Sequence, residues 1–148
     1  MLHLDVEKSI LRFSSGQKLE ETCVDFTEQA RQTNREICGL VAGEVNATSV
    51  VISTICRVPN THRSRNSFGI SYKDVKDFCA ANGSRFLGVI HTHQKSCSPS
   101  HSDLIAMKRL SWLFLILSPS PDISDLFQIA GYQWDKEILK HYVMKRMK

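Results

Sequence analysis

The stretch GVIHTHQKSCSPSHSD, residues 88–103, combines signals for two kinds of local structure. Its first part completes the run RFLGVIHTH at 85–93, and a largely apolar run of this length predicts a buried strand. Towards its end, Ser100 stands where a helix N-cap is expected, with Asp103 at the third helical position. The stretch therefore predicts a buried strand that turns through a polar loop into a helix reaching to about residue 111.

The segments before this stretch predict a helix followed by a hairpin. Apolar side chains at helical spacing indicate an amphipathic helix over 17–32. These side chains are Leu19, Cys23, Phe26 and Ala30. Two runs rich in β-branched residues follow, EICGLVAGEV at 36–45 and TSVVISTICRV at 48–58, and they are joined by the turn residues NAT. This pattern is typical of an antiparallel hairpin.

Other segments complete the predicted secondary structure. In chain order they are a strand or strand pair at 2–13, a short strand SFGIS at 67–71, a helix at 72–83 that ends at Gly83, a strand at 113–118, and a final hairpin around Asp135 and Lys136. The fold class expected from this order is α+β, with a mixed β-sheet flanked by two or three helices. We expect residues 1–148 to form a single domain, because no repeat or low-complexity linker interrupts them.

Composition limits the classes of function. Five cysteines without a CxxC pair predict free thiols in a reducing compartment, so the expected location is the cytoplasm. No apolar run approaches the roughly 20 residues of a membrane helix, so no membrane partner is expected. The net charge of +4 is modest, and the densest basic cluster is the tail KHYVMKRMK at 140–148. A nucleic-acid partner is therefore not expected either.

Two histidines near the end of the predicted strand are candidate metal ligands. His91 and His93 are two positions apart, so on a strand both side chains leave the same face and can reach one cation. Asp103 lies in the first turn of the following helix, which can return the chain to the same place. Two nitrogens and one carboxylate suit Zn²⁺ and leave the fourth position to water, as in catalytic zinc sites. Histidines at this spacing also occur at polar surfaces or in cores, and Cys97 or His101 could replace Asp103 as a ligand.

A glutamate upstream stands in an unusual setting. Glu36 leads into the apolar run at 36–45, and a carboxylate next to a buried strand is costly unless a partner stabilises it. A metal-bound water is one such partner. The alternative is that Glu36 is an exposed charge at the start of the strand.

Together these residues form an ordered pattern. The sequence reads E-x-C-G-L-x-x-G from Glu36, and H-T-H-x6-S-x-x-D follows from His91 about fifty residues later. This pattern resembles the JAMM (MPN+) family of zinc metallo-isopeptidases. Over roughly residues 20–132 the chain looks most like the compact prokaryotic branch of that family. Three further positions are similar to the asparagine-then-phenylalanine stretch of the family, namely Asn60, Phe68 and Ile70.

The resemblance implies a fold, a cofactor and a division of roles. The fold would be that of the MPN/JAMM domain, which is similar to a cytidine-deaminase-like architecture. Zn²⁺ would be held by His91, His93 and Asp103. Glu36 would take a proton from the zinc-bound water and return it to the leaving amine, and the hydroxyl of Ser100 would donate to the oxyanion.

The resemblance also implies a substrate. The enzyme would hydrolyse the amide or isopeptide bond after the C-terminal glycine of a ubiquitin-like modifier, whose tail would be held as an added strand at an exposed sheet edge. Further partners would be activating or conjugating enzymes of the same pathway, and sulfur transfer, protein conjugation and antiviral defence all stay open. The sequence does not indicate an oligomeric state.

Two other interpretations compete with this one. A relative that has lost catalysis would serve as an MPN-type scaffold in a complex, but such relatives usually lack ligands that are all present here. A DNA-associated bacterial relative would share the histidine motif and carry a further helical segment upstream, for which we expect no room. One departure from the family is Gln94, which stands where proline usually follows the second histidine. We expect residues 94–99 to be more mobile as a result, without loss of activity.

Overall fold

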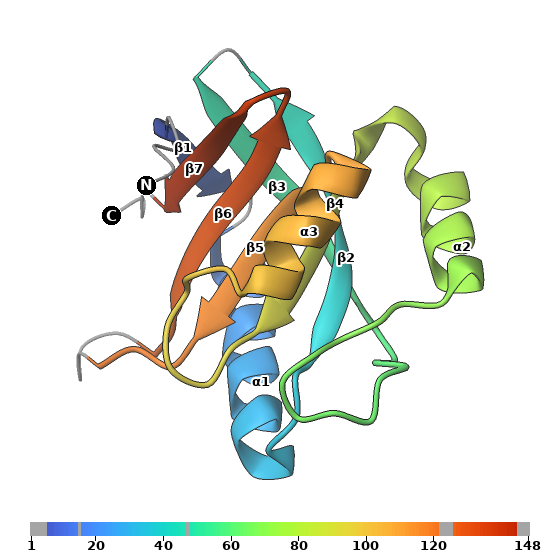
Figure 1. The fold of residues 1–148 in the computed structure, drawn as a ribbon, viewed down its shortest axis with the longest axis vertical. Helices are drawn as coiled ribbons and strands as arrows, with labels where there is room; N and C mark the ends of the chain where they lie inside the picture. The colour runs from blue at the N-terminus through green and yellow to red at the C-terminus, as the bar shows by residue number, and fades with distance from the viewer. Residues whose placement is uncertain (1–5, 15, 47, 122–125, 145–148) are drawn as a thin grey trace.

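The computed structural model describes residues 6–14, 16–46, 48–121 and 126–144 (Figure 1). These residues form seven strands, three α-helices and one 3-10 turn, in the order β1 (Val6–Phe13), α1 (Gly16–Thr33), β2 (Cys38–Val45), β3 (Ser49–Val58), α2 (Tyr72–Asn82), η1 (Gly83–Arg85), β4 (Phe86–Thr92), α3 (His101–Leu110), β5 (Leu113–Ser118), β6 (Gln128–Asp135) and β7 (Ile138–Met144). β1 confirms the predicted N-terminal strand, whose first residues lie outside the described part. Among the described helices, none combines the length and the apolar character needed to cross a membrane.

The described strands make one mixed sheet that closes into a barrel, in the order β1-β3-β2-β4-β5-β6-β7, with β7 paired to β1. β1 lies parallel to β3 and β7, and β4 lies parallel to β5, while the other pairs are antiparallel. The predicted α+β class with a mixed sheet is confirmed. The sequence pattern does not predict the closure, which leaves none of the described strands at an open end of the sheet. The exposed sheet edge expected for a substrate tail is limited to part of β3, because residues 54–58 pair with β2 and, among the described residues, not with β1.

Helices cover both faces of this curved sheet (Figure 1). α1 packs against β3, β4 and β5, with Phe26 buried in the contact. In a second core, Phe78 of α2 and Met107 of α3 are buried together with Val89 of β4. Side chains two positions apart on a strand share a face. His91 therefore leaves β4 on the face that α2 and α3 cover.

Most predicted elements agree with the structure. The predicted apolar stripe of α1 is buried throughout, at Leu19, Cys23, Phe26 and Ala30. α2 begins after Ser71, whose side chain accepts a hydrogen bond from the Asp74 N–H, and it ends at Gly83, which has a φ of 55°. β2 and β3 form the predicted antiparallel hairpin, and β6 turns into β7 directly after Asp135.

The short strand predicted at 67–71 is wrong, because these residues lie in an irregular segment between β3 and α2. The side chain of Asn60 explains the difference. Its oxygen accepts from the Gly69 N–H at 3.0 Å, and its amide donates to the Ser67 carbonyl at 3.1 Å. Backbone groups that a strand would pair with a neighbouring strand are bonded here to one side chain.

Gly88 brings β4 and β5 close together. Its φ is 158°, and a Cβ added there would lie 2.0 Å from the carbonyl oxygen of Leu113. A real Cβ does not approach a backbone oxygen so closely, so any other residue would shift the two strands. The contact holds the register in which His91 lies beside Ile116.

Candidate metal centre

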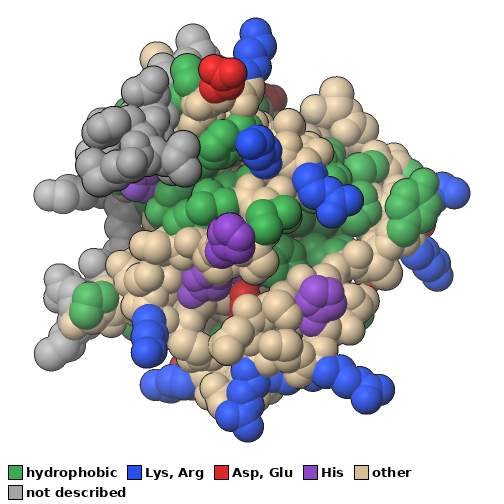
Figure 2. Space-filling model, viewed as in Figure 1, with side chains coloured by type: hydrophobic (Ala, Val, Ile, Leu, Met, Phe, Trp, Pro, Cys, Tyr) green, Lys and Arg blue, Asp and Glu red, His purple; other side chains and the backbone are tan. Residues whose placement is uncertain are grey.

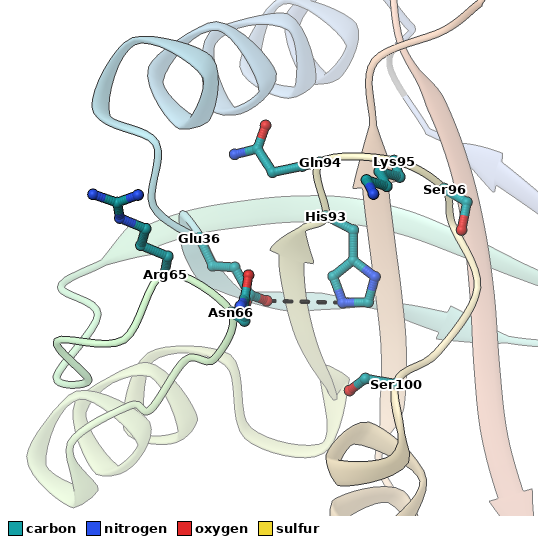
Figure 3. A pocket seen from close by; sticks show the side chains of 8 residues that line it. All are labelled: Glu36, Arg65, Asn66, His93, Gln94, Lys95, Ser96 and Ser100. Atoms are coloured by element: carbon teal, nitrogen blue, oxygen red, sulfur yellow. Dashed lines mark ion pairs between the residues drawn. The ribbon is translucent and has the colours of Figure 1, made fainter.

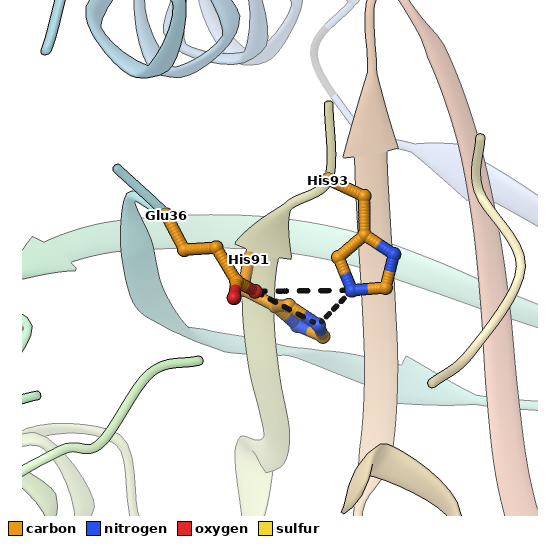
Figure 4. Close-up of side chains that lie close together, drawn as sticks. All are labelled: Glu36, His91 and His93. Carbon is orange, nitrogen blue, oxygen red and sulfur yellow. Dashed lines mark hydrogen bonds and ion pairs between the residues drawn. The ribbon is translucent and has the colours of Figure 1, made fainter. Parts of the chain in front are cut away.

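β4 delivers the two histidines. His93 follows the end of the strand, where its backbone N–H still donates to the Leu117 carbonyl on β5 at 2.7 Å. The Nε2 atoms of His91 and His93 lie 3.1 Å apart, and the rings meet at an angle of 70° (Figure 4). The side chain of His91 is fully buried, and that of His93 is 18% exposed. The structure therefore brings both imidazoles to one point.

The N-terminus of α3 delivers Asp103 to the same point. Ser100 caps this helix, because its Oγ accepts from the Asp103 N–H at 3.1 Å and its own N–H donates to Asp103 Oδ2 at 2.9 Å. These reciprocal bonds form a capping box, which orients the carboxylate. Oδ2 lies 3.3 Å from His91 Nε2 and 3.2 Å from His93 Nε2. One carboxylate therefore serves both the helix cap and the histidine cluster.

Glu36 reaches the cluster from the segment between α1 and β2. Its side chain is 6% exposed, and its Oε1 lies 3.9 Å from His91 Nε2 and 3.8 Å from His93 Nε2 (Figure 4). Two hydrogen bonds hold this segment against β4: the Ile37 N–H donates to Thr92 Oγ1 at 2.9 Å, and the Thr92 N–H donates to the Ile37 carbonyl at 3.0 Å. The alternative of an exposed charge at the start of the strand is therefore wrong.

Burial and charge shift the pKa values of the cluster in opposite directions. Burial alone would raise the pKa of Asp103, but hydrogen bonds from His91, His93 and the Ser100 N–H hold it well below its usual range. Complete burial lowers the pKa of His91 against the pull of Asp103. Burial also opposes the charged form of His93, but Asp103 and Glu36 outweigh it and raise the His93 pKa. The Asp103 carboxylate is therefore ionised, as a metal ligand must be.

Glu36 is a group of the cluster that can exchange protons near neutral pH. Burial raises its pKa to about 7, while the nearby charge of His93 opposes this shift and that of Asp103 adds to it. A carboxyl group with a pKa close to neutrality can both accept and release a proton near pH 7.

Two overlapping sets of three side chains could hold a metal ion. The ligand atoms of Glu36, His91 and His93 lie within 4.8 Å of one another. Those of His91, His93 and Asp103 are closer together, at 3.1, 3.2 and 3.3 Å. Atoms bonded to a tetrahedral zinc ion at about 2.0–2.1 Å lie about 3.3 Å from one another. The second set therefore fits zinc more closely than the first.

Other polar side chains of the loop and of the first turn of α3 make contacts elsewhere. Cys97 Sγ lies 3.2 Å from Ser118 Oγ, and His101 is exposed. Gln94 donates from its side-chain amide to the Ala30 carbonyl of α1 at 3.3 Å. The residue that replaces the usual proline thus ties the loop to a helix, and none of these contacts adds a ligand to the cluster.

Three further residues support the site, and the sequence alone assigned none of them a function there. Phe68 stacks on the His91 ring, with centroids 4.2 Å apart and planes at 23°. Asn60 donates to the Glu36 carbonyl at 2.9 Å, and Thr92 bonds the segment after Glu36 as described above. Thr92 could have been found from the sequence, because it is a hydroxyl residue between the two histidines on an otherwise apolar strand. For Phe68 and Asn60 only the family resemblance offered a signal.

Glu36 borders three cavities in the described part of the chain. A polar cavity of about 360 Å³ opens beside His93 and Ser100 (Figure 3). An apolar cavity of about 620 Å³ starts at Asp103. One of its walls is the irregular segment that precedes α2, and another is α3. A third, of about 350 Å³, lies beside the end of β3. Glu36 is therefore accessible from more than one side.

Comparisons with known proteins agree with this picture. The chain is similar to the solution structure of protein DSY2949 from Desulfitobacterium hafniense, with a TM-score of 0.67 and 20% identity over 93% of this chain and 94% of that chain. At this identity the likeness shows the fold alone. A comparison with curated proteins found no match. A family model described as prokaryotic homologs of the JAB domain matches residues 20–129, which confirms the resemblance drawn from the sequence. The chain therefore belongs to the Prok-JAB family, within the JAB/MPN group of domains.

Proposed function

We propose that the protein is a zinc-dependent hydrolase that cleaves the amide or isopeptide bond after the C-terminal glycine of a ubiquitin-like modifier. The observation that carries the proposal is the triangle of His91 Nε2, His93 Nε2 and Asp103 Oδ2, with edges of 3.1–3.3 Å and the Glu36 carboxylate beside it. Family membership supports a peptidase or an inactive scaffold. The complete set of residues favours the peptidase.

In this proposal His91, His93 and Asp103 hold the ion. Glu36 Oε1, at 3.8 and 3.9 Å from the two imidazole nitrogens, lies outside the spacing of that triangle, so its carboxylate would stay available for proton transfer. Bound zinc would supply Lewis acidity and lower the pKa of a bound water towards about 7. The Ser100 N–H donates a hydrogen bond to Asp103 Oδ2 and so orients the carboxylate. Such supporting hydrogen bonds are usual for ligands in metal sites.

Glu36 carries protons in this mechanism. It borders both the polar and the apolar cavity, so its carboxylate faces a bound substrate as well as the histidines. It takes a proton from the attacking water and delivers it to the leaving amine, which departs uncharged. Asn60 and Thr92 form hydrogen bonds that hold the backbone beside Glu36. The carboxylate therefore stays within reach of the attacking water and of the leaving amine.

Ser100 supplies a hydrogen-bond donor. Its Oγ accepts from the Asp103 N–H, which leaves the hydroxyl proton available for donation. Ser102 Oγ lies 3.1 Å from it and is one acceptor. When substrate fills the polar cavity, which Ser100 lines, the hydroxyl donates instead to the oxygen of the attacked carbonyl.

The glycine-terminated tail would lie in the cavities beside Glu36, one of which borders the end of β3. The modifier and the activating or conjugating enzymes of its pathway would be the partners. A reporter fused behind the terminal Gly-Gly of a ubiquitin-like protein tests the proposal. We expect its release by the zinc-loaded protein, and no release after chelation or by the Glu36→Gln variant.

Two other results would contradict the proposal. Efficient cleavage of casein without preference for the fusion would indicate a zinc protease of another specificity. A zinc-loaded protein that cleaves no fusion from a panel of modifiers would favour the scaffold.

A further inference from the structure

Two segments beside the site carry positive charge only. Residues 57–71 and 93–102 include Arg57, Arg63, Arg65 and Lys95, and neither range contains aspartate or glutamate. On the face that carries α3, Lys and Arg side chains are spread around a central apolar area, while acidic side chains are sparse (Figure 2). The face around the site is therefore basic, although the net charge of the chain is only +4.

Two of these cations line the polar cavity beside the cluster. Figure 3 shows Arg65 on one side of the Glu36–His93 pair and Lys95 on the other. Both side chains are exposed, and neither has an ion-pair partner among the described residues. By contrast, Arg31, Arg85 and Lys140 each lie within 4.0 Å of a carboxylate. Arg65 and Lys95 are therefore available to an acidic group that enters the cavity.

The neighbouring cavity has the opposite character. Its walls are largely apolar and include Phe68, Ile70, Val75, Ala106 and Trp112. Glu36 borders this cavity as well as the polar one, so the two meet at the proposed proton carrier. A chain that passes Glu36 would place apolar side chains in one cavity and the residues beyond the cleaved bond in the other.

We propose that this face selects a protein substrate with apolar residues on one side of the cleaved bond and acidic residues on the other. The proposal rests on the hydrolase function proposed above and names the substrate chemistry that the site accepts. Charge complementarity would speed encounter and orient the chain, and burial of apolar side chains in the larger cavity would hold it.

A polypeptide fits this face better than a nucleic acid does. A nucleic acid would satisfy the cations through its phosphates, but phosphates that continue into the larger cavity would meet the carboxylates of Glu36 and Asp103, which border it. A protein segment satisfies both cavities at once.

Binding of short peptides to the Glu36→Gln variant tests the proposal without cleavage. The probes are Leu-Leu-Gly-Gly-Asp-Asp, Asp-Asp-Gly-Gly-Leu-Leu and the two peptides in which lysine replaces aspartate, all measured by calorimetry. We expect one of the acidic peptides to bind about tenfold more tightly than its lysine counterpart at low salt, with a smaller difference at high salt. Equal binding of each acidic peptide and its counterpart would overturn the proposal, as would equally tight binding of a single-stranded oligonucleotide.

Reversing the charge of the two cavity cations tests whether they cause the preference for acidic peptides. With Arg65→Glu and Lys95→Glu added, the preference should turn towards the lysine peptides. The matched control adds Lys18→Glu and Lys76→Glu, two exposed cations that line none of the three cavities, and should keep the acidic preference. An acidic preference that survives the first pair would also overturn the proposal. Cleavage of the reporter fusion by the wild type is scored separately, so loss of the hydrolase function and loss of this preference are distinguishable.

Discussion

Replacing Ser100 with alanine separates two roles that one hydroxyl combines. As the N-cap of α3, its Oγ accepts from the Asp103 N–H at 3.1 Å, and loss of such an acceptor costs about 1 kcal/mol. For a domain of this size that corresponds to a fall in Tm of about 2–4 °C. As the proposed oxyanion donor, its loss should lower kcat by about 10²–10³. Zinc content should not change, because the bond that orients Asp103 Oδ2 comes from the backbone N–H of residue 100.

Ser71→Ala is the matched control for this variant. Ser71 caps α2 in the same way, with its Oγ accepting from the Asp74 N–H at 3.2 Å, and it lines none of the three cavities beside Glu36. We expect a similar fall in Tm and full activity. Thermal melts, elemental analysis and cleavage of the reporter fusion measure the three quantities. If Ser100→Ala cleaves as fast as Ser71→Ala, the hydroxyl is a helix cap alone and the proposed donor is wrong.

Three further predictions address the metal, the proton carrier and the substrate. Wild-type protein should contain about one zinc ion per chain by elemental analysis, and a His91→Ala/His93→Ala double variant should lose it, because the set of three ligands is broken; equal zinc in both would place the ligands elsewhere. Glu36→Gln should keep the fold and the zinc but lose most activity in single-turnover assays, since only proton transfer is removed, and a wild-type rate would refute that role. A large residue in place of the terminal glycine of the modifier should reduce kcat/KM at least tenfold, equivalent to about 1.4 kcal/mol of transition-state binding, while unchanged cleavage would show that glycine is not selected.

Local patterns predicted most of the secondary structure because they reflect which side chains must be buried. The stripe of α1 and the apolar runs of β2 to β5 are read from neighbouring residues alone. The strand predicted at 67–71 failed because a side chain nine residues before Gly69 bonds its N–H. The local patterns also did not predict that the barrel closes, because the pairing of β1 with β7 joins segments that are far apart in the sequence.

The residues of the candidate site likewise differ in how far local sequence patterns predicted them. His91, His93 and Asp103 lie close in sequence, so strand alternation and helix capping brought them near one another in the prediction. The choice of Asp103 over Cys97 or His101 depended on the family resemblance. Glu36 joins them through contacts between distant segments, the pairing of Cys38 with His91 and the bonds between Ile37 and Thr92, and its role was assigned from the family resemblance. The basic face around the site depends on which loops become neighbours, which no local pattern reveals.

The short sequence distance between the three proposed ligands has a consequence for how metal binding affects stability. The three proposed ligands lie within one segment in which Asp103 follows His91 by twelve positions, so a denatured chain keeps all of them close together. Zinc would therefore bind the denatured ensemble as well as the native state, and its stabilising effect would be smaller than native affinity alone implies. A chain in which β4 and the first turn of α3 have formed without β2 would already contain the three proposed ligands, while lacking Glu36, the proposed proton carrier.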